Sequence, residues 1–166
     1  MSFANKYFSR YKTYPKIFEN NPCPQTGIIV IIPCYDDEFI FETLKSLEKA
    51  QKPICKIEII VIVNSGEKTP KHIVQKNKEI FLKLNEQAKN EFYKTFNLLV
   101  YNIEDTAHKI AGVGFARKLG IDEAVRRFNF LNKPQAIICS LDADSIVSDD
   151  YFIEIYNYFE NNPKIK

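Results

Sequence analysis

The sequence predicts an α/β protein with a mainly parallel sheet and helices on both faces. Two observations predict this class. Short apolar runs rich in β-branched residues alternate with longer segments whose apolar residues recur at helical spacing. The alternation has the order βαβαβαβα, and successive parallel strands require right-handed crossovers through helices that cover the sheet.

The predicted strands are continuous apolar runs, which are typical of strands buried on both faces of a parallel sheet. They are residues 28–32, 57–63, 96–101 and 136–141. Gly27 opens the first run and Pro33 stops it. The second run ends at Asn64, Ser65 and Gly66, where the composition predicts a turn.

The predicted helices are residues 39–50, 69–92, 114–128 and 149–159. Each shows the spacing of an amphipathic helix, and the last one is entered through an acidic first turn. Residues 1–26 have no clean periodicity and are predicted to be an N-terminal arm whose aromatic side chains pack on the domain. Residues 27–166 then form the domain itself.

Composition excludes several classes of function. The chain has 166 residues, 45% of them apolar, which is enough for one domain with its own core. Its 23 basic and 21 acidic residues are interspersed, so no basic stripe for nucleic acid is expected. The four cysteines form no Cys-x-x-Cys pair, which favours a reduced, cytoplasmic setting. Neither a membrane span nor an export signal is expected, because long apolar runs are missing from the sequence.

Polar residues follow three of the predicted strands, at the edge where open parallel sheets bind ligands. We therefore expect Tyr35, Asn64, Asp142 and Asp144 at one edge. Side chains two apart in an extended segment point the same way, so Asp142 and Asp144 are expected to be adjacent carboxylates. Such a pair suits Mg²⁺ or Mn²⁺, with substrate phosphates completing the coordination shell. A solvated turn is the alternative interpretation.

Two glycines and an arginine introduce the third predicted helix. Gly112 and Gly114 allow close approach of a phosphate-bearing ligand, which the helix N-terminus and Arg117 would favour. The alternative is that the glycines serve tight packing and that Arg117 pairs with a surface acid. The segment is not a dinucleotide fingerprint, since it does not follow the first strand and Arg117 takes the third glycine position.

The remaining reactive residues point away from other chemistries. His72 and His108 have no partner at zinc-ligand spacing and are expected to be ordinary surface residues. Neither a Gly-x-Ser-x-Gly elbow nor a P-loop occurs in the sequence. Cys34 has no histidine in a matching context, so a buried or pocket-lining role is favoured over a nucleophile.

Four motifs, in this order and spacing, resemble the family 2 glycosyltransferases. Residues 28–35 resemble the family's first strand with its Pro-x-Tyr ending, and residues 58–66 its second strand. Residues 114–121 are similar to the family's Ala-Arg-Asn-x-Gly helix, with Lys118 in place of the asparagine. Residues 141–144 are similar to its Asp-x-Asp metal motif. The resemblance spans about residues 27–163 and implies the donor-binding half of a Rossmann-like GT-A nucleotide-diphospho-sugar transferase fold, truncated after that motif.

The resemblance also implies roles for individual residues. The implied nucleotide-sugar pocket is lined by Pro33, Cys34, Tyr35, Glu38, Asn64, Arg117, Asp142 and Ala143. Asn64 stands where an aspartate often contacts the base. Asp142 and Asp144 would hold a Mn²⁺ or Mg²⁺ ion that bridges the diphosphate.

The implied function is the metal-dependent, inverting transfer of a sugar from a nucleotide-diphospho-sugar donor to an acceptor hydroxyl. A UDP-sugar is the favoured donor, and a glycan or a lipid-linked molecule is the acceptor. The implied location is the cytoplasm, at the cytoplasmic membrane face. Family members continue beyond the metal motif, so the general base is expected beyond Lys166. A catalytically silent nucleotide-sugar-binding or scaffold module is the alternative. A nucleotidyltransferase would need a Gly-rich loop after the first strand, where Tyr35 to Glu38 stand instead.

Overall fold

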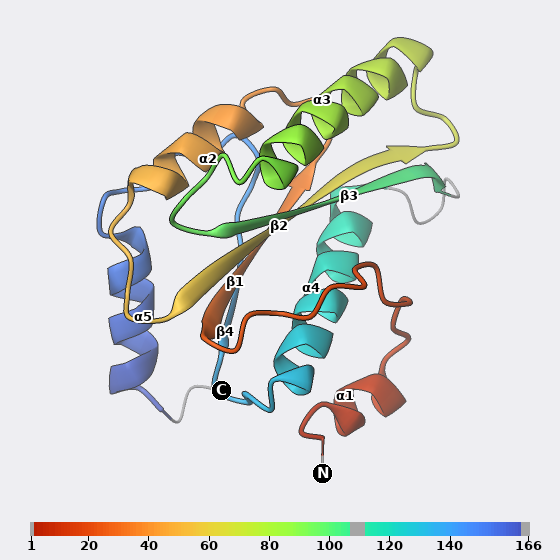
Figure 1. The fold of residues 1–166 in the computed structure, drawn as a ribbon. Coiled ribbons are helices and arrows are strands. Elements are labelled where there is room, and N and C mark those ends of the chain that lie inside the picture. Colours follow the sequence, from red (N-terminus) through yellow and green to blue (C-terminus); the bar gives the residue numbers. More distant parts are fainter. Residues whose placement is uncertain (1, 107–111, 164–166) are drawn as a thin grey trace.

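An all-parallel sheet forms the centre of the protein in a computed structural model that describes residues 2–106 and 112–163 (Figure 1). Its strands are β1 (Thr26–Cys34), β2 (Lys56–Gly66), β3 (Asn97–Thr106) and β4 (Ile137–Ser140). They lie in the order β3-β2-β1-β4, and each neighbouring pair is parallel. The predicted α/β class with a mainly parallel sheet is confirmed.

Helices cover both faces of this sheet. They are α1 (Asn5–Arg10), α2 (Ile40–Lys49), α3 (Lys71–Lys89), α4 (Val113–Phe130) and α5 (Tyr151–Asn161). Figure 1 shows α2, α3 and α5 on one face and α4 on the other, together with the N-terminal segment. Successive side chains of β1 point to opposite faces. Ile28, Val30 and Ile32 face the side covered by α2, α3 and α5, whereas Ile29 and Ile31 face α4.

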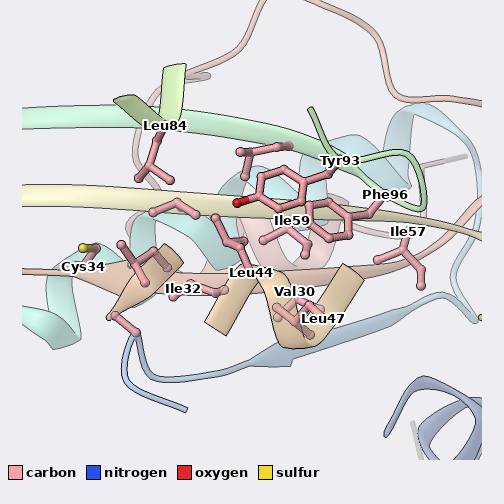
Figure 2. Packing of buried hydrophobic residues seen from close by; sticks show 14 of the residues in the cluster. Val30, Ile32, Cys34, Leu44, Leu47, Ile57, Ile59, Leu84, Tyr93 and Phe96 are labelled. Carbon is pink, nitrogen blue, oxygen red and sulfur yellow. The ribbon is translucent and has the colours of Figure 1, made fainter. Parts of the chain in front are cut away.

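The core holds the strands so that their carboxyl ends stay in register. Figure 2 shows Val30 and Ile32 of β1 and Ile59 of β2 packed with Leu44 of α2 and Leu84 of α3. These side chains are fully buried. Burying each one contributes about 1.5–3 kcal/mol, so the sheet is a rigid platform for whatever its edge carries.

On the other face α4 approaches the sheet closely at Gly120. A Cβ atom at that position would lie 2.3 Å from Cγ2 of Ile31, well inside van der Waals contact. Glycine is therefore required here by the packing of α4 on β1, and it keeps the first turns of α4 close to the end of β1.

β2 is longer than the sequence predicts. It continues to Gly66, so the predicted turn at Asn64, Ser65 and Gly66 is wrong. The chain turns after Gly66 instead, where the Thr69 amide donates to the Gly66 carbonyl over 2.9 Å. The register with β3 shifts between Asn64 and Gly66. The turn-forming residues therefore cause an irregularity within the strand instead of ending it.

The N-terminal segment packs along α4. The rings of Tyr14 and Phe115 meet edge to face with 4.9 Å between centroids. Two buried carboxylates of α4 bind the backbone of the segment: Asp122 accepts from the Tyr14 amide at 3.0 Å, and Glu123 from the Ile17 amide at 3.2 Å. The segment also contains the short helix α1, which the sequence did not predict.

Candidate functional site

The polar residues that follow β1, β2 and β4 meet at one edge of the sheet. β1 ends at Cys34 and β4 at Ser140, and Asn64 lies two residues before the end of β2. These strands are neighbours and parallel, so their carboxyl ends share an edge. The structure thus brings Tyr35, Asn64 and the segment from Asp142 to that edge.

The residues at the end of β1 divide into buried and exposed ones. Pro33 and Cys34 are buried, and burial raises the pKa of the Cys34 thiol to about 12. Cys34 therefore stays protonated at neutral pH and packs in the core, which is the buried role that the sequence favours. Tyr35, with 39% of its surface exposed, and Glu38 are the members of this group that a ligand can reach.

An open pocket of about 290 Å³ lies at this edge. It is lined by Tyr35, Asn64, Gly66, Lys68, Thr69, Gly112 and Val113. Asn64 is only 3% exposed, and its Oδ1 has no hydrogen-bond partner among the described residues. An unpaired buried acceptor costs about 1–3 kcal/mol, and a ligand that offers an N–H or O–H here would restore the lost hydrogen bond.

A buried asparagine of α3 hydrogen-bonds to two of the segments around the pocket, and its role was not predicted from the sequence. Asn77 Oδ1 accepts from the Asp36 amide at 2.8 Å, and its Nδ2 donates to the Asn64 carbonyl at 3.1 Å and to Ser65 Oγ at 3.0 Å. A signal was present in the sequence, since Asn77 interrupts the apolar face of the helix at a position three residues before Ile80.

The carboxylate pair lies in a turn rather than in an extended segment. The Ser145 amide donates to the Asp142 carbonyl at 3.3 Å, which closes a turn around Ala143 and Asp144. Ala143 is buried, and its carbonyl accepts from Thr43 Oγ1 of α2 at 2.6 Å. Both aspartate side chains are nevertheless exposed. The extended conformation expected from sequence is therefore wrong, while the carboxylates remain open to a ligand.

Arg117, in the first turns of α4, connects the pocket with this turn. Its Nη2 lies 2.7 Å from Asp142 Oδ1, and its Nε donates to Ser140 Oγ at 2.8 Å. Both partners of the ion pair are partly exposed, at 36% and 66% of their side chains. The helix begins with Val113, which lines the pocket, so the start of α4 spans the distance between the pocket and Asp142.

The glycines before α4 have different roles. Gly112 has a φ of +137°, a backbone conformation that side chains with a Cβ rarely adopt. A Cβ on Gly114 would meet nothing within 4 Å, so the described structure gives no packing reason for that glycine. His72 is exposed, as expected, and His108 lies outside the described residues.

The donor set at this edge suits a hard divalent cation that also binds a ligand. Among residues 2–106 and 112–163, the structure contains no group of three or more His, Cys, Asp or Glu side chains placed to hold a metal ion. Asp142 and Asp144 alone supply two carboxylates, the number Mg²⁺ commonly takes from protein when phosphate oxygens complete its shell. The chemistry of these two side chains therefore matches such an ion.

Comparison with known proteins gives a result at the level of the fold. No protein-family model matches the sequence, and no curated protein matches it. Among solved structures, residues 1–349 of TarS from S. aureus superpose with a TM-score of 0.53 at 20% identity, over 83% of this chain. The chain has the GT-A fold of TarS.

The superposed region is a part of TarS. This chain covers 33% of TarS 1–349, and TarS 1–349 has also been solved in complex with UDP-GlcNAc and in complex with UDP. The UDP-GlcNAc complex superposes on this chain with the same TM-score of 0.53, over 83% of this chain and 32% of the TarS chain. Within the described residues, no helix combines the length and apolar character needed to cross a bilayer.

Proposed function

We propose that this chain is the donor-binding part of a metal-dependent glycosyltransferase that uses a UDP-sugar. The observation that carries the proposal is a pocket with a buried, unpaired acceptor on Asn64 at the same sheet edge as the Asp142-Ala143-Asp144 turn. The shared fold with TarS, which has been solved with UDP-GlcNAc, supports the same site.

The nucleotide end of the donor is assigned to the pocket. The exposed ring of Tyr35 offers an aromatic surface for a base, and Asn64 Oδ1 offers the acceptor for a ring N–H such as that of uracil. Buried hydrogen-bonding groups discriminate strongly against ligands that leave them unpaired. A base without a donor at this position is therefore expected to bind more weakly.

The diphosphate end is assigned to the far side of the site. Asp142 and Asp144 would hold Mn²⁺ or Mg²⁺, which when bound neutralises the charge of the nucleotide diphosphate as leaving group. Arg117 adds a fixed guanidinium beside Asp142, and the N-terminus of α4 at Gly112 and Val113 favours an anion. The inverting course and the glycan or lipid-linked acceptor rest on the family resemblance.

Calorimetry with UDP tests the proposal directly. UDP is expected to bind in the presence of Mn²⁺ and to lose at least tenfold in affinity when excess chelator removes the ion, because the carboxylates and phosphates share it. ADP serves as the matched control for the base. Equal affinity with and without chelator, or failure of UDP to bind at all, would contradict the proposal. Binding of a UDP-sugar without any transfer to an acceptor would assign the protein to the silent binding module instead.

A further inference from the structure

We propose that Asn77 of α3 is the positioning residue of this pocket, because it holds the segment after β1 and the end of β2 in one fixed arrangement. Through that arrangement it sets where Tyr35 and Asn64 stand relative to each other. The inference rests on the proposed nucleotide-binding function. It assigns to Asn77 no contact with the ligand.

Asn77 is an unusual residue for its place in the helix. It is 1% exposed, in the middle of α3, on the face that also carries the buried Ile80 and Leu84. Asparagine has low helix propensity, and burying an amide costs free energy unless its hydrogen bonds are replaced. A leucine would satisfy both the helix and the core, so the amide needs another explanation.

The hydrogen bonds of Asn77 provide that explanation. Both hydrogens of its amide group are used, one by the Asn64 carbonyl and the other by Ser65 Oγ, and its oxygen accepts from the Asp36 amide. The three partners belong to two different strand ends. One side chain therefore joins the segment after β1 to the end of β2 just beyond Cys34 and Val63, the last residues that the two strands pair.

On the β1 side the bond acts on a strained residue. Asp36 has a φ of +53°, which costs free energy for a residue other than glycine and persists only where neighbours impose it. Lys76 adds to the restraint: its Nζ lies 2.9 Å from Asp36 Oδ1 and 3.2 Å from the Asp36 carbonyl. Since Tyr35 directly precedes Asp36, these contacts fix the direction in which the Tyr35 ring enters the pocket.

On the β2 side the bond compensates for an interrupted ladder. The register of β2 against β3 shifts between Asn64 and Gly66. Hydrogen bonds from Asn77 to the Asn64 carbonyl and to Ser65 hold the strand at this irregularity. The position of Asn64, which lines the pocket and carries the buried, unpaired Oδ1, follows from that backbone geometry.

Replacing Asn77 with leucine tests the role. Asn77→Leu keeps the size of the side chain and removes all of its hydrogen bonds, so UDP affinity in the presence of Mn²⁺ is expected to fall at least tenfold in protein shown to be folded by circular dichroism. Thr26→Val is the matched control: Thr26 is equally buried, but its hydroxyl bonds Glu58 at the opposite end of β1. It should lose stability and keep the affinity of the wild type.

Hydrogen exchange supplies a readout that needs no ligand. Amides of residues 35–38 and 64–66 are expected to exchange at least tenfold faster in Asn77→Leu than in Thr26→Val. A folded Asn77→Leu protein with UDP affinity within twofold of the wild type, or with unchanged exchange in these segments, overturns the inference. Failure of the wild-type protein to bind UDP overturns the proposed function, whatever the hydrogen exchange of the variants shows.

A second variant keeps the test decisive if Asn77→Leu does not fold. Asn77→Asp retains the acceptor for the Asp36 amide but places a carboxylate against the Asn64 carbonyl, where the native amide donates. Faster exchange is then expected at residues 64–66, residues 35–38 should stay protected, and UDP affinity should still fall at least tenfold. Affinity within twofold of the wild type in this variant also overturns the inference.

Discussion

Asp142 and Asp144 differ in their surroundings although they flank the same buried alanine. Asp142 already has a cationic partner in Arg117, at 2.7 Å. Asp144 is exposed and makes no hydrogen bond or ion pair within the part of the chain that the structure describes. A metal ion would therefore gain most from the uncompensated charge of Asp144, and substitution of this residue separates a metal role from a structural one.

We predict that Asp144→Asn lowers metal-dependent UDP affinity at least tenfold, which corresponds to about 1.4 kcal/mol. The melting temperature without metal should hardly change, because the side chain has no described contact to lose. Asp149→Asn, an exposed aspartate a few residues further on, is the control and should leave both quantities unchanged. Unchanged affinity in Asp144→Asn would contradict the metal role, and an equal loss of metal-free stability would point to a structural one.

At the scale of single residues, the sequence predicts which residues gather at the sheet edge. It does not predict the local conformation and the hydrogen bonds that hold them there. Asn64 and the aspartate pair follow apolar runs, and a parallel sheet brings such positions together whatever the details. The turn at Asp142 depends on a hydrogen bond from Thr43, far away in the sequence, to the Ala143 carbonyl. Contacts of that kind leave no periodic trace. For Asn77 the periodic pattern marks only a polar residue on the apolar face of α3, and its partners at Asp36, Asn64 and Ser65 could not be read from the pattern.

Helix α4 contributes residues both to the candidate site and to the buried core. Its first turns carry Arg117, and its buried face carries Arg127, which forms a two-pronged ion pair with Glu58 of β2 at 2.7 and 3.1 Å. Both side chains are almost completely buried. Arg127 also donates to the Asn20 carbonyl at 3.0 Å, so the same guanidinium holds the N-terminal segment.

Removing one partner of this pair should be costly. We predict that Arg127→Met destabilises the fold by about 3–5 kcal/mol, because Glu58 is left buried without its counter-charge. The double variant Glu58→Met with Arg127→Met should recover part of the loss. Urea unfolding measures both values.

The exposed pair of Lys45 and Glu42 provides the matched control. Lys45→Met removes a surface ion pair of 2.7 Å and should change stability by no more than about 1 kcal/mol. If the double variant lost as much as the sum of its two single variants, the buried charges would not be coupled and the interpretation of the pair would be wrong.

Element types were predictable from apolar periodicity, whereas some element ends were not. The predicted strand 28–32 and helix 114–128 lie within β1 and α4. At Asn64, Ser65 and Gly66 the local composition predicts a turn, yet pairing with β3 keeps the segment in the strand. Tertiary pairing overrides local preference there, and no single-sequence pattern carries that information.

The molecule as a whole protects its centre from solvent and from reagents. Cys34 lies at the end of β1, within the apolar cluster between the sheet and the helices α2 and α3, and burial holds its pKa near 12. Cys23, in the N-terminal segment, is exposed. Modification of Cys23 therefore requires no unfolding, whereas modification of Cys34 requires the core around the end of β1 to open.

We predict that iodoacetamide at pH 8 modifies the exposed Cys23 in the folded protein, whereas Cys34 reacts only through unfolding. At that pH a group with a pKa of about 12 is almost entirely protonated, and the thiolate is the reactive form. Peptide mass spectrometry over time measures the two rates, and urea should accelerate only the second one steeply. Rapid modification of Cys34 in native protein would show that the end of β1 opens locally.

The strand order has a consequence for the synthesis of the chain. β1 lies between β2, which follows it soon in the sequence, and β4, whose Ile137 pairs with Ile28. At about 5–20 residues per second, the ribosome needs on the order of ten seconds between these two residues. During that interval one edge of a strand composed of isoleucine and valine has no partner, and such edges template aggregation. The emergence of β4 therefore covers the open edge of β1, and until then the nascent chain exposes an aggregation-prone strand.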